Sequence, residues 1–288
     1  MPEILKNNGL VSIIIPCYNG SLLVQETLQS ILNQEGVEFE IIFIDDGSKD
    51  DSKLKVLSFN DARISYFYQD NAGVSAARNK GLSIAKGDYI VFFDADDKMT
   101  PGFLTTRRTF LSNNSSIDFV CGQVQNFTDK MIGAEIFQGA CNTKEVLLYP
   151  AGITTCPSNY MFKKNFLANN NLTFNNRLAS TADRFFLIQC MLSGNSSLNI
   201  NAGKLLYRIS PNSMSNNLTT TLIEDNEKYY KLLLKQHLIP LTIRNESLFI
   251  GNMILCKSYW KVRRRFRAGR FALKALWLNP GLFLKNLF

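Results

Sequence analysis

Short apolar runs alternate with amphipathic stretches over the first hundred residues of the chain. Four runs are almost wholly apolar and are expected to be strands buried on both faces of a parallel sheet: 10–16, 39–44, 64–68 and 89–93. Between them, residues 21–32 have apolar side chains at helical spacing, and residues 75–85 are rich in alanine and closed by Gly87. This alternation predicts an α/β fold with a mostly parallel, Rossmann-like sheet flanked by helices.

Polar residues follow each of the four predicted strands. They occupy positions 18–20, 45–48, 70–73 and 94–97. The carboxyl ends of parallel strands meet at one edge of a sheet, and open α/β sheets bind their ligands in the crevice beyond that edge. We therefore expect these four loops to form one site.

Beyond the first hundred residues the pattern is weaker. A helix is expected from Pro101 to about Leu111, followed by a mixed region to about Pro211. From Leu222 onward the spacing predicts mostly helix, with prolines at 240 and 280 as punctuation. The second half therefore predicts a mainly helical C-terminal extension.

Asp94 and Asp96 stand at alternate positions after the fourth predicted strand, so both carboxylates point to the same side. Two neighbouring anions repel unless a cation joins them. A hard divalent ion such as Mg²⁺ or Mn²⁺ binds carboxylate and diphosphate oxygens together. The alternative is a solvated acidic turn before Thr100 and Pro101.

Two further residues bear on a nucleotide. In the segment Asp45-Asp46-Gly47-Ser48 a carboxylate can accept hydrogen bonds from a nucleotide base or from ribose hydroxyls, and Gly47 allows close approach. Arg78 falls on the first turns of a predicted helix, aimed at the same edge, where it would contact a base or a phosphate. The alternatives are a plain Asp-Gly turn and a surface ion pair.

Taken together, four segments closely resemble the family 2 glycosyltransferases of the GT-A fold. They are SIIIPCYNG (12–20), IIFIDDGSKDDS (41–52), NAGVSAARNKGLSIAKGDYI (71–90) and VFFDADD (91–97). Several motifs in the same order are far more specific than one. The resemblance implies an inverting transferase that uses Mn²⁺ or Mg²⁺ and a nucleotide-diphosphate donor, a UDP-sugar or similar.

The resemblance also assigns roles along the nucleotide edge. Asp46 contacts the base, Arg78 assists, Asp94 meets the ribose and Asp96 ligates the metal. The remaining nucleotide-binding residues are Pro16, Tyr18, Asn19 and Ala95.

An inverting transfer needs a base for the acceptor hydroxyl. By the resemblance this is Asp183, although Ala182 stands where the family usually has Glu; the alternative is that Asp183 only caps a helix over 184–192. A second departure is Ser210, where a His often approaches the metal or diphosphate. Its absence leaves either fewer protein ligands or a substitute such as Arg208 or Ser213.

The formal net charge of +8 is concentrated after Glu246, the last acidic residue. From Tyr259 onward, Lys and Arg residues surround apolar residues at helical spacing. The apolar residues are Val262, Phe266, Leu273 and Trp277. Such a stretch either lies on an anionic membrane surface or packs its stripe on the catalytic domain. Nucleic acid is not expected as a partner, because no recognised nucleic-acid module accompanies the bases.

The remaining features concern the cellular location of the protein and the redox state of its cysteines. The chain starts MPEILKNNGL without a secretory signal, has no long apolar span, and scatters its six cysteines without a zinc pattern. We expect reduced thiols and a cytoplasmic protein, which lies at the inner face of the membrane if the basic stretch binds lipid rather than packing on the catalytic domain.

The resemblance divides the chain into a GT-A catalytic domain and a tail. Residues 1–215 form the catalytic domain, with a nucleotide-binding half at 1–100 and an acceptor-side half at 101–215, and residues 216–288 form the helical basic region. The predicted function is transfer of a sugar to a hydroxyl of a glycan or lipid-linked acceptor in surface polysaccharide synthesis. The alternative is a non-catalytic transferase-like protein that binds nucleotide or membrane.

Overall fold

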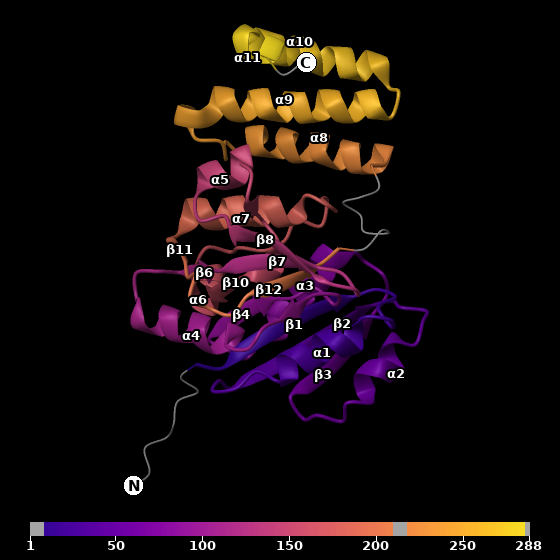
Figure 1. Ribbon diagram of the computed structural model, residues 1–288, viewed down its shortest axis with the longest axis vertical. Coiled ribbons are helices and arrows are strands. Elements are labelled where there is room, and N and C mark those ends of the chain that lie inside the picture. The colour runs from indigo at the N-terminus through magenta and orange to yellow at the C-terminus, as the bar shows by residue number, and fades with distance from the viewer. Residues whose placement is uncertain (1–8, 210–217, 286–288) are drawn as a thin grey trace.

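A computed structural model describes residues 9–209 and 218–285 of the chain (Figure 1). Within these residues, seven strands form the main sheet in the order β11-β6-β10-β4-β1-β2-β3. Their bounds are β1 Val11–Cys17, β2 Phe39–Asp46, β3 Ile64–Gln69, β4 Tyr89–Phe92, β6 Phe119–Cys121, β10 Tyr160–Lys163 and β11 Ser196–Leu198. The four neighbours β4, β1, β2 and β3 are all parallel, whereas β10 runs antiparallel to both of its neighbours. The predicted mostly parallel α/β sheet is thereby confirmed.

Helices cover both faces of this sheet because successive strand residues point to opposite sides. On one face, Ile14 and Phe92 pack in a cluster with residues of α3 (Val74–Ile84) and α7 (Ala182–Ser193). On the other face, Ile13 and Ile15 pack with α1 (Val24–Leu32) and α4 (Phe103–Asn113). Two short helices, α2 (Ser52–Leu57) and α6 (Lys164–Asn169), complete the layers.

The prediction that all four N-terminal strands are buried on both faces was wrong for β3. Strands β1 and β2 are almost wholly buried, but β3 alternates partly buried and exposed residues, with Tyr68 56% exposed. The reason is its position at the edge of the sheet. Its aromatic residues suit a half-covered strand as well as a buried one.

A second sheet, which the periodicity did not resolve, is formed mostly by strands of the mixed region after residue 113, together with the short strand β5 before it. Its order within the described residues is β5-β12-β7-β8-β9, with bounds β5 Lys98–Met99, β12 Leu205–Arg208, β7 Gln123–Phe127, β8 Ile132–Gly139 and β9 Ile153–Thr154. The short helices α5 (Thr143–Leu148) and η1 (Pro157–Asn159) lie between these strands in sequence. Strand β5 follows Asp97 directly, so this sheet is attached to the acidic loop at the end of β4.

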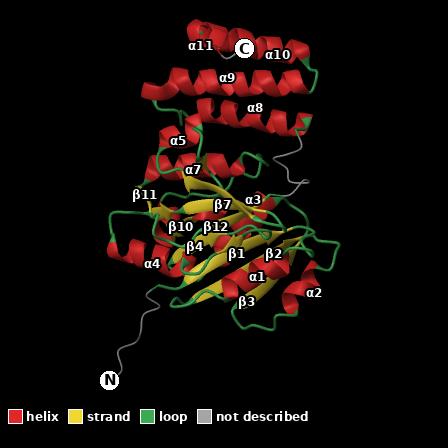
Figure 2. Ribbon diagram, in the orientation of Figure 1, coloured by secondary structure: helices red, strands yellow, loops and turns green. Residues whose placement is uncertain are grey.

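The C-terminal region is helical, as predicted, and stacks as a layer at one end of the molecule (Figures 1 and 2). Its helices are α8 (Thr220–Lys235), η2 (Leu241–Ile243), α9 (Arg244–Lys261), α10 (Arg265–Leu278) and α11 (Pro280–Lys285). Tyr229, Tyr259 and Phe271 belong to the apolar cluster that includes Phe92 and Phe186 under the sheet. The predicted boundary between residues 215 and 216 lies outside the described residues.

The expected single amphipathic stripe from Tyr259 to Trp277 is divided between two helices. Helix α9 ends at Lys261, and Arg263 takes a left-handed conformation with φ 60° in the turn before α10. Helix α10 buries Ala268, Phe271 and Ala275 and exposes Phe266, Leu273 and Trp277. Apolar side chains therefore lie on two faces of α10, one packed and one open. No helix among the described residues is long and apolar enough to cross a membrane.

Candidate active site

The carboxyl ends of the parallel strands face a cavity of about 730 Å³. All nine residues expected at the site line this cavity: Pro16, Tyr18, Asn19, Asp46, Arg78, Asp94, Ala95, Asp96 and Asp183. They come from the ends of β1, β2 and β4 and from helices α3 and α7. The structure therefore brings together residues that are up to 167 positions apart, from Pro16 to Asp183 (183 minus 16).

The loops after β1 and β2 are tied to each other by hydrogen bonds. The backbone N–H of Asn19 donates to Ser48 Oγ at 2.9 Å, and Asn19 Oδ1 accepts from the backbone N–H of Lys49 at 2.9 Å. The N–H of Gly20 donates to Ser52 Oγ at 2.9 Å. Asn19 holds a positive φ of 52°, a conformation that Asn tolerates better than most residues. This wall is consequently fixed before any ligand arrives.

Asp46 is buried and already accepts three hydrogen bonds. Its donors are Gln69 Nε2 at 2.7 Å and the backbone N–H groups of Ala72 and Gly73 at 2.9 and 2.8 Å. Gly47 is required beside it, because φ is 84° and a Cβ would lie 2.8 Å from the backbone nitrogen of Asn71. In the structure Asp46 therefore holds the turn before α3 against the end of β2.

Arg78 links the nucleotide edge of the cavity to Asp183, the expected general base. Its side chain is 3% exposed; Nη2 donates to Asp94 Oδ1 at 2.7 Å and Nη1 to Asp183 Oδ1 at 2.6 Å. The guanidinium also lies over the ring of Phe174, 5.0 Å from its centroid. The surface ion pair weighed as an alternative is thus excluded, since this pair is buried and two-sided.

The carboxyl group of Asp183 has an unusual protonation equilibrium. Burial, opposed by Arg78 and reinforced by Asp94, raises its pKa to about 6. No described residue donates to its second oxygen, Oδ2. At neutral pH Asp183 is therefore mostly a carboxylate with one free oxygen at the cavity, as a general base requires.

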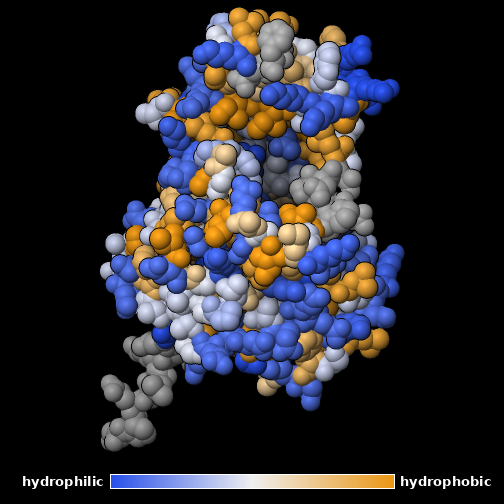
Figure 3. Space-filling model, in the orientation of Figure 1, coloured by the Kyte–Doolittle hydropathy of each residue, from blue (hydrophilic) through white to orange (hydrophobic). Residues whose placement is uncertain are grey.

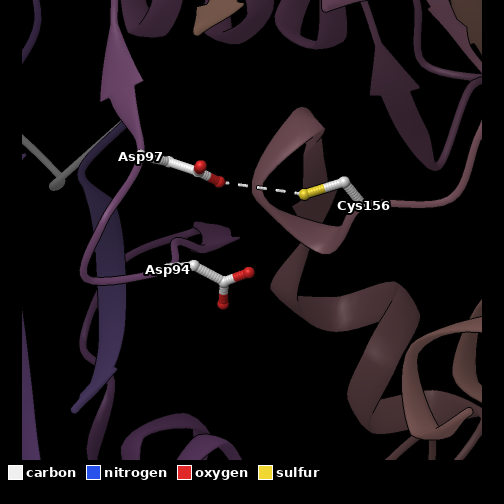
Figure 4. A group of neighbouring side chains, drawn as sticks. All are labelled: Asp94, Asp97 and Cys156. Carbon is white, nitrogen blue, oxygen red and sulfur yellow. Dashed lines mark hydrogen bonds between the residues drawn. The ribbon is translucent and has the colours of Figure 1, made fainter. Parts of the chain in front are cut away.

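The acidic loop after β4 places three carboxylates close together. Burial and the charge of Asp94 raise the pKa of Asp96 to about 6, and no described side chain or N–H of another residue donates to the Asp96 carboxylate. Asp97 is buried, accepts the N–H of Arg208 at 3.1 Å and lies beside Cys156 (Figure 4). Ligand atoms of Asp94, Asp97 and Cys156 all lie within 4.8 Å of one another. Sequence reasoning missed Asp97 and Cys156, which are brought together by η1 rather than by local spacing.

Arg208, one of the two residues considered as a substitute for the missing histidine, is engaged elsewhere. Its guanidinium donates to the carbonyl oxygen of Asp96 at 2.9 Å, to Glu26 at 2.7 Å and to Asp129. It braces the acidic loop rather than facing a diphosphate. Ser210 and Ser213 lie outside the described residues.

The loop before Asp183 is held by a residue that sequence reasoning missed. Asp225 of α8 is 4% exposed and accepts four hydrogen bonds from this loop. The donors are the N–H of Ala179 at 3.0 Å, Ser180 Oγ at 3.0 Å, and the N–H and Oγ1 of Thr181 at 3.0 and 2.8 Å. Thr181 is the N-cap residue of α7, but its side chain makes no cap hydrogen bond within that helix. The available signal was an aspartate in line with the apolar positions 229 and 233 of an amphipathic helix.

Comparisons with known proteins identify the family of the chain. Residues 12–169, more than half of the chain, match the family described as Glycosyl transferase family 2. The chain belongs to this family. Family 2 relatives include an uncharacterized glycosyltransferase of Rickettsia conorii, 35% identical over 158 residues that are 54% of this chain and 26% of that protein. The chain thus spans only about a quarter of the length of that relative.

One further relative and one solved structure match over more of the chain. The Escherichia coli protein named UDP-Glc:alpha-D-GlcNAc-diphosphoundecaprenol beta-1,3-glucosyltransferase WfgD is 29% identical over 72% of this chain and 80% of its own length. Among solved structures, S. aureus TarS 1-349 in complex with UDP-GlcNAc matches with a TM-score of 0.66 and 16% identity, covering 93% of this chain and 91% of that one. The structural likeness establishes the shared GT-A fold.

Proposed function

We propose that the protein is an inverting, metal-dependent glycosyltransferase that moves a hexosyl or N-acetylhexosaminyl group from a UDP-sugar to a hydroxyl of a glycan or lipid-linked acceptor. The proposal rests mainly on the two ion pairs of Arg78, whose guanidinium holds Asp183 on one side and Asp94 on the other. A nucleotide-binding module has no physical need of a carboxylate held at that point with an oxygen left free.

In the proposed reaction the acceptor hydroxyl oxygen attacks the anomeric carbon of the donor sugar. The bond between that carbon and the diphosphate oxygen breaks, so that UDP leaves with the electron pair. Asp183 Oδ2 takes the proton of the hydroxyl and later releases it to water. Attack from the side opposite the leaving group inverts the configuration of the anomeric carbon.

The donor set of the acidic loop fits a hard divalent ion. Asp96 offers a carboxylate to the cavity that no described neighbour neutralises, and Asp94 keeps one oxygen beyond its bond to Arg78. These two residues would hold Mn²⁺ or Mg²⁺, which supplies positive charge for the departing diphosphate. The thiol of Cys156 is a soft ligand that such ions do not need.

The nucleotide is proposed to be UDP, bound along Pro16, Tyr18, Asn19, Asp46 and Ala95. TarS was solved with UDP and with UDP-GlcNAc, and the name of WfgD specifies UDP-Glc, which supports this choice for a chain of the same fold and family. Tyr18 is 53% exposed beside the cavity, and its ring is available to stack on a base.

A cytoplasmic location at an anionic membrane surface is also proposed. Phe266, Leu273 and Trp277 of α10 are 92%, 69% and 84% exposed, and no acidic residue follows Glu246. Figure 3 shows hydrophobic side chains gathered over the helical end of the molecule, with hydrophilic ones beside them. Exposed aromatic rings among Lys and Arg are the chemistry of a helix lying in the headgroup layer.

Calorimetric titration with UDP, with and without Mn²⁺, tests the central proposal. Wild type is expected to bind UDP in a metal-dependent way, Asp96→Ala to lose the metal dependence, and Asp183→Asn to bind UDP normally while losing about 10²-fold or more of sugar transfer. The non-catalytic alternative predicts metal-independent binding and no donor turnover. Equal loss of UDP binding in both variants would contradict the roles assigned to these carboxylates.

A further inference from the structure

Arg184, the residue after Asp183, lines the same cavity with an unusual set of neighbours. Its guanidinium lies 5.2 Å from the ring centroid of Tyr149 and 4.9 Å from that of Tyr229. Its one hydrogen bond runs from Nη2 to the carbonyl oxygen of Val146 at 3.3 Å, and Nε is buried without a partner. No described carboxylate lies within 4.0 Å of it.

The other buried arginines show what such a side chain normally requires. Arg78 and Arg208 each donate to two carboxylates. Arg107 is fully buried without a carboxylate but donates to Phe103 O, Gly203 O and Asn159 Oδ1 at 3.1, 2.7 and 3.1 Å. Arg184 stays protonated like them, yet among the described residues only the carbonyl oxygen of Val146 accepts from one of its five N–H groups. Stacking on two rings offsets part of the lost hydration but satisfies none of the remaining donors.

Two tyrosine hydroxyls next to Arg184 also have unused donors. The hydroxyls of Tyr229 and Tyr230 both lie near enough to act on the charge of Arg184, that of Tyr230 more closely, and neither hydroxyl donates its own proton to an acceptor among the described residues. Tyr149, on the other side, is 47% exposed and holds a left-handed φ of 51°, an uncommon conformation for a bulky residue. A guanidinium with one backbone acceptor and two hydroxyls with none are thus collected beside the catalytic cavity.

We propose that Arg184, with Tyr149 beside it, is a subsite for a phosphate or diphosphate group of the acceptor. A guanidinium offers such an anion paired N–H donors in a plane, which matches the donors left unused here. The inference rests on the proposed function and narrows it to phosphate-bearing acceptors.

The position of Arg184 favours the acceptor over the donor as the source of the phosphate. The donor diphosphate is expected at Asp94 and Asp96, where a metal would neutralise it. Arg184 lies on the wall built by later segments of the chain: Tyr149 after α5, the loop 179–181 before α7, and Leu222 and Asn226 of α8. A second anion on this wall would place an acceptor next to Asp183.

The test follows inorganic phosphate by ³¹P NMR as it is titrated onto full-length protein saturated with UDP and Mg²⁺. Wild type is expected to bind phosphate saturably while UDP is bound. Arg184→Gln should bind phosphate at least about tenfold more weakly than wild type, and Arg184→Lys should have an intermediate affinity. Arg177→Gln, an equal charge change at an exposed position seven residues earlier, is expected to behave as wild type. Thermal unfolding and UDP affinity of each variant report whether it is folded.

Three results would overturn the inference. Phosphate that competes with UDP, together with weaker UDP binding in Arg184→Gln, would assign the residue to the donor diphosphate. Equal phosphate binding in wild type and Arg184→Gln, with only a lower unfolding temperature in the variant, would make Arg184 a structural contact between α5, α7 and α8. Absence of phosphate binding to wild type would also refute it. If UDP does not bind, the proposed function fails separately, and the same titration without UDP still decides the subsite.

Discussion

Replacing Arg78 by methionine removes a buried guanidinium that donates to Asp94 on one side and to Asp183 on the other. Methionine has a similar length and leaves no buried cation behind. The two carboxylates then face each other across the cavity with no positive charge between them. The expected results are a less stable protein, a base that is harder to deprotonate and slower transfer.

The structure sets the size of the effect on stability. Hydrogen bonds to charged groups contribute about 1.5–3 kcal/mol each. The side chains of Asp94 and Asp183 are 27% and 28% exposed and keep part of their hydration, so we expect a loss of about 2–4 kcal/mol in unfolding free energy rather than the full sum. Arg78→Lys keeps the charge, but its compact ammonium reaches one carboxylate well, and it should lose roughly half as much.

The pH dependence gives a second and more specific readout. Arg78 lowers the pKa of Asp183, which stands at about 6 in the intact protein, so its removal raises that pKa further. The acid limb of kcat/KM should move upward by about one pH unit or more. A folded-state pKa above the usual value also means that Asp183 favours folding most at low pH, and that this contribution is lost as the pH rises through about 6. The destabilisation by Arg78→Met should therefore be larger at pH 8 than at pH 5.

Urea unfolding at both pH values, and the pH profile of transfer at saturating Mn²⁺, measure these effects. Saturating metal keeps Asp96 deprotonated and out of the profile. The control is Lys80→Met, which removes a cation from the same helix whose ammonium donates only to the carbonyl oxygen of Tyr68, at 2.9 Å. An unchanged acid limb of the kcat/KM profile in Arg78→Met, or an equal loss of stability at the two pH values, would refute the role given to Arg78 between Asp94 and Asp183.

Two further predictions concern α8 and α10. Asp225→Asn replaces one carboxylate oxygen that accepts from Thr181 by an NH₂ group, which is a donor. The expected result is a fall in kcat of about tenfold with UDP affinity unchanged. A parallel loss of UDP binding would show general misfolding instead. The double variant Phe266→Ser and Trp277→Ser should lose more than about tenfold in co-sedimentation with phosphatidylglycerol–phosphatidylcholine vesicles. The control Leu22→Ser, at a residue that is 91% exposed in the turn before α1, should not. Equal binding of wild type to pure phosphatidylcholine, or none to either vesicle, would count against the anionic surface.

The N-terminal half of the fold was predictable because its signals are local. Each of the four parallel strands and the helices α1, α3 and α4 begin and end within three residues of the predicted bounds. The polar loops after the strands were placed at one edge by the rule for parallel sheets alone. The residues of the site gathered as expected, whereas their roles stay predictions until ligands are measured.

What was missed depends on contacts between distant segments. The second sheet pairs β12 with β7 and β5, strands of two to five residues that carry too little periodicity to detect. The pairing of Asp97 with Cys156 spans 59 positions, and that of Asp225 with Thr181 spans 44. The edge position of β3 likewise follows from strand order, which composition does not encode.

The hold of Asp225 on the loop 179–181 changes how the helical region should be regarded. Sequence alone suggested a basic appendage that begins after a complete catalytic domain. In the structure α8 supplies the carboxylate that fixes the start of α7, and Leu222 and Asn226 on either side of it line the catalytic cavity. A helix that both carries the cavity wall and anchors the loop before Asp183 cannot be detached without disturbing the base. Since α9 packs on α8, and α10 packs on α9 and continues the same apolar core, contact of α10 with a membrane would fix the orientation of the catalytic cavity toward the acceptor.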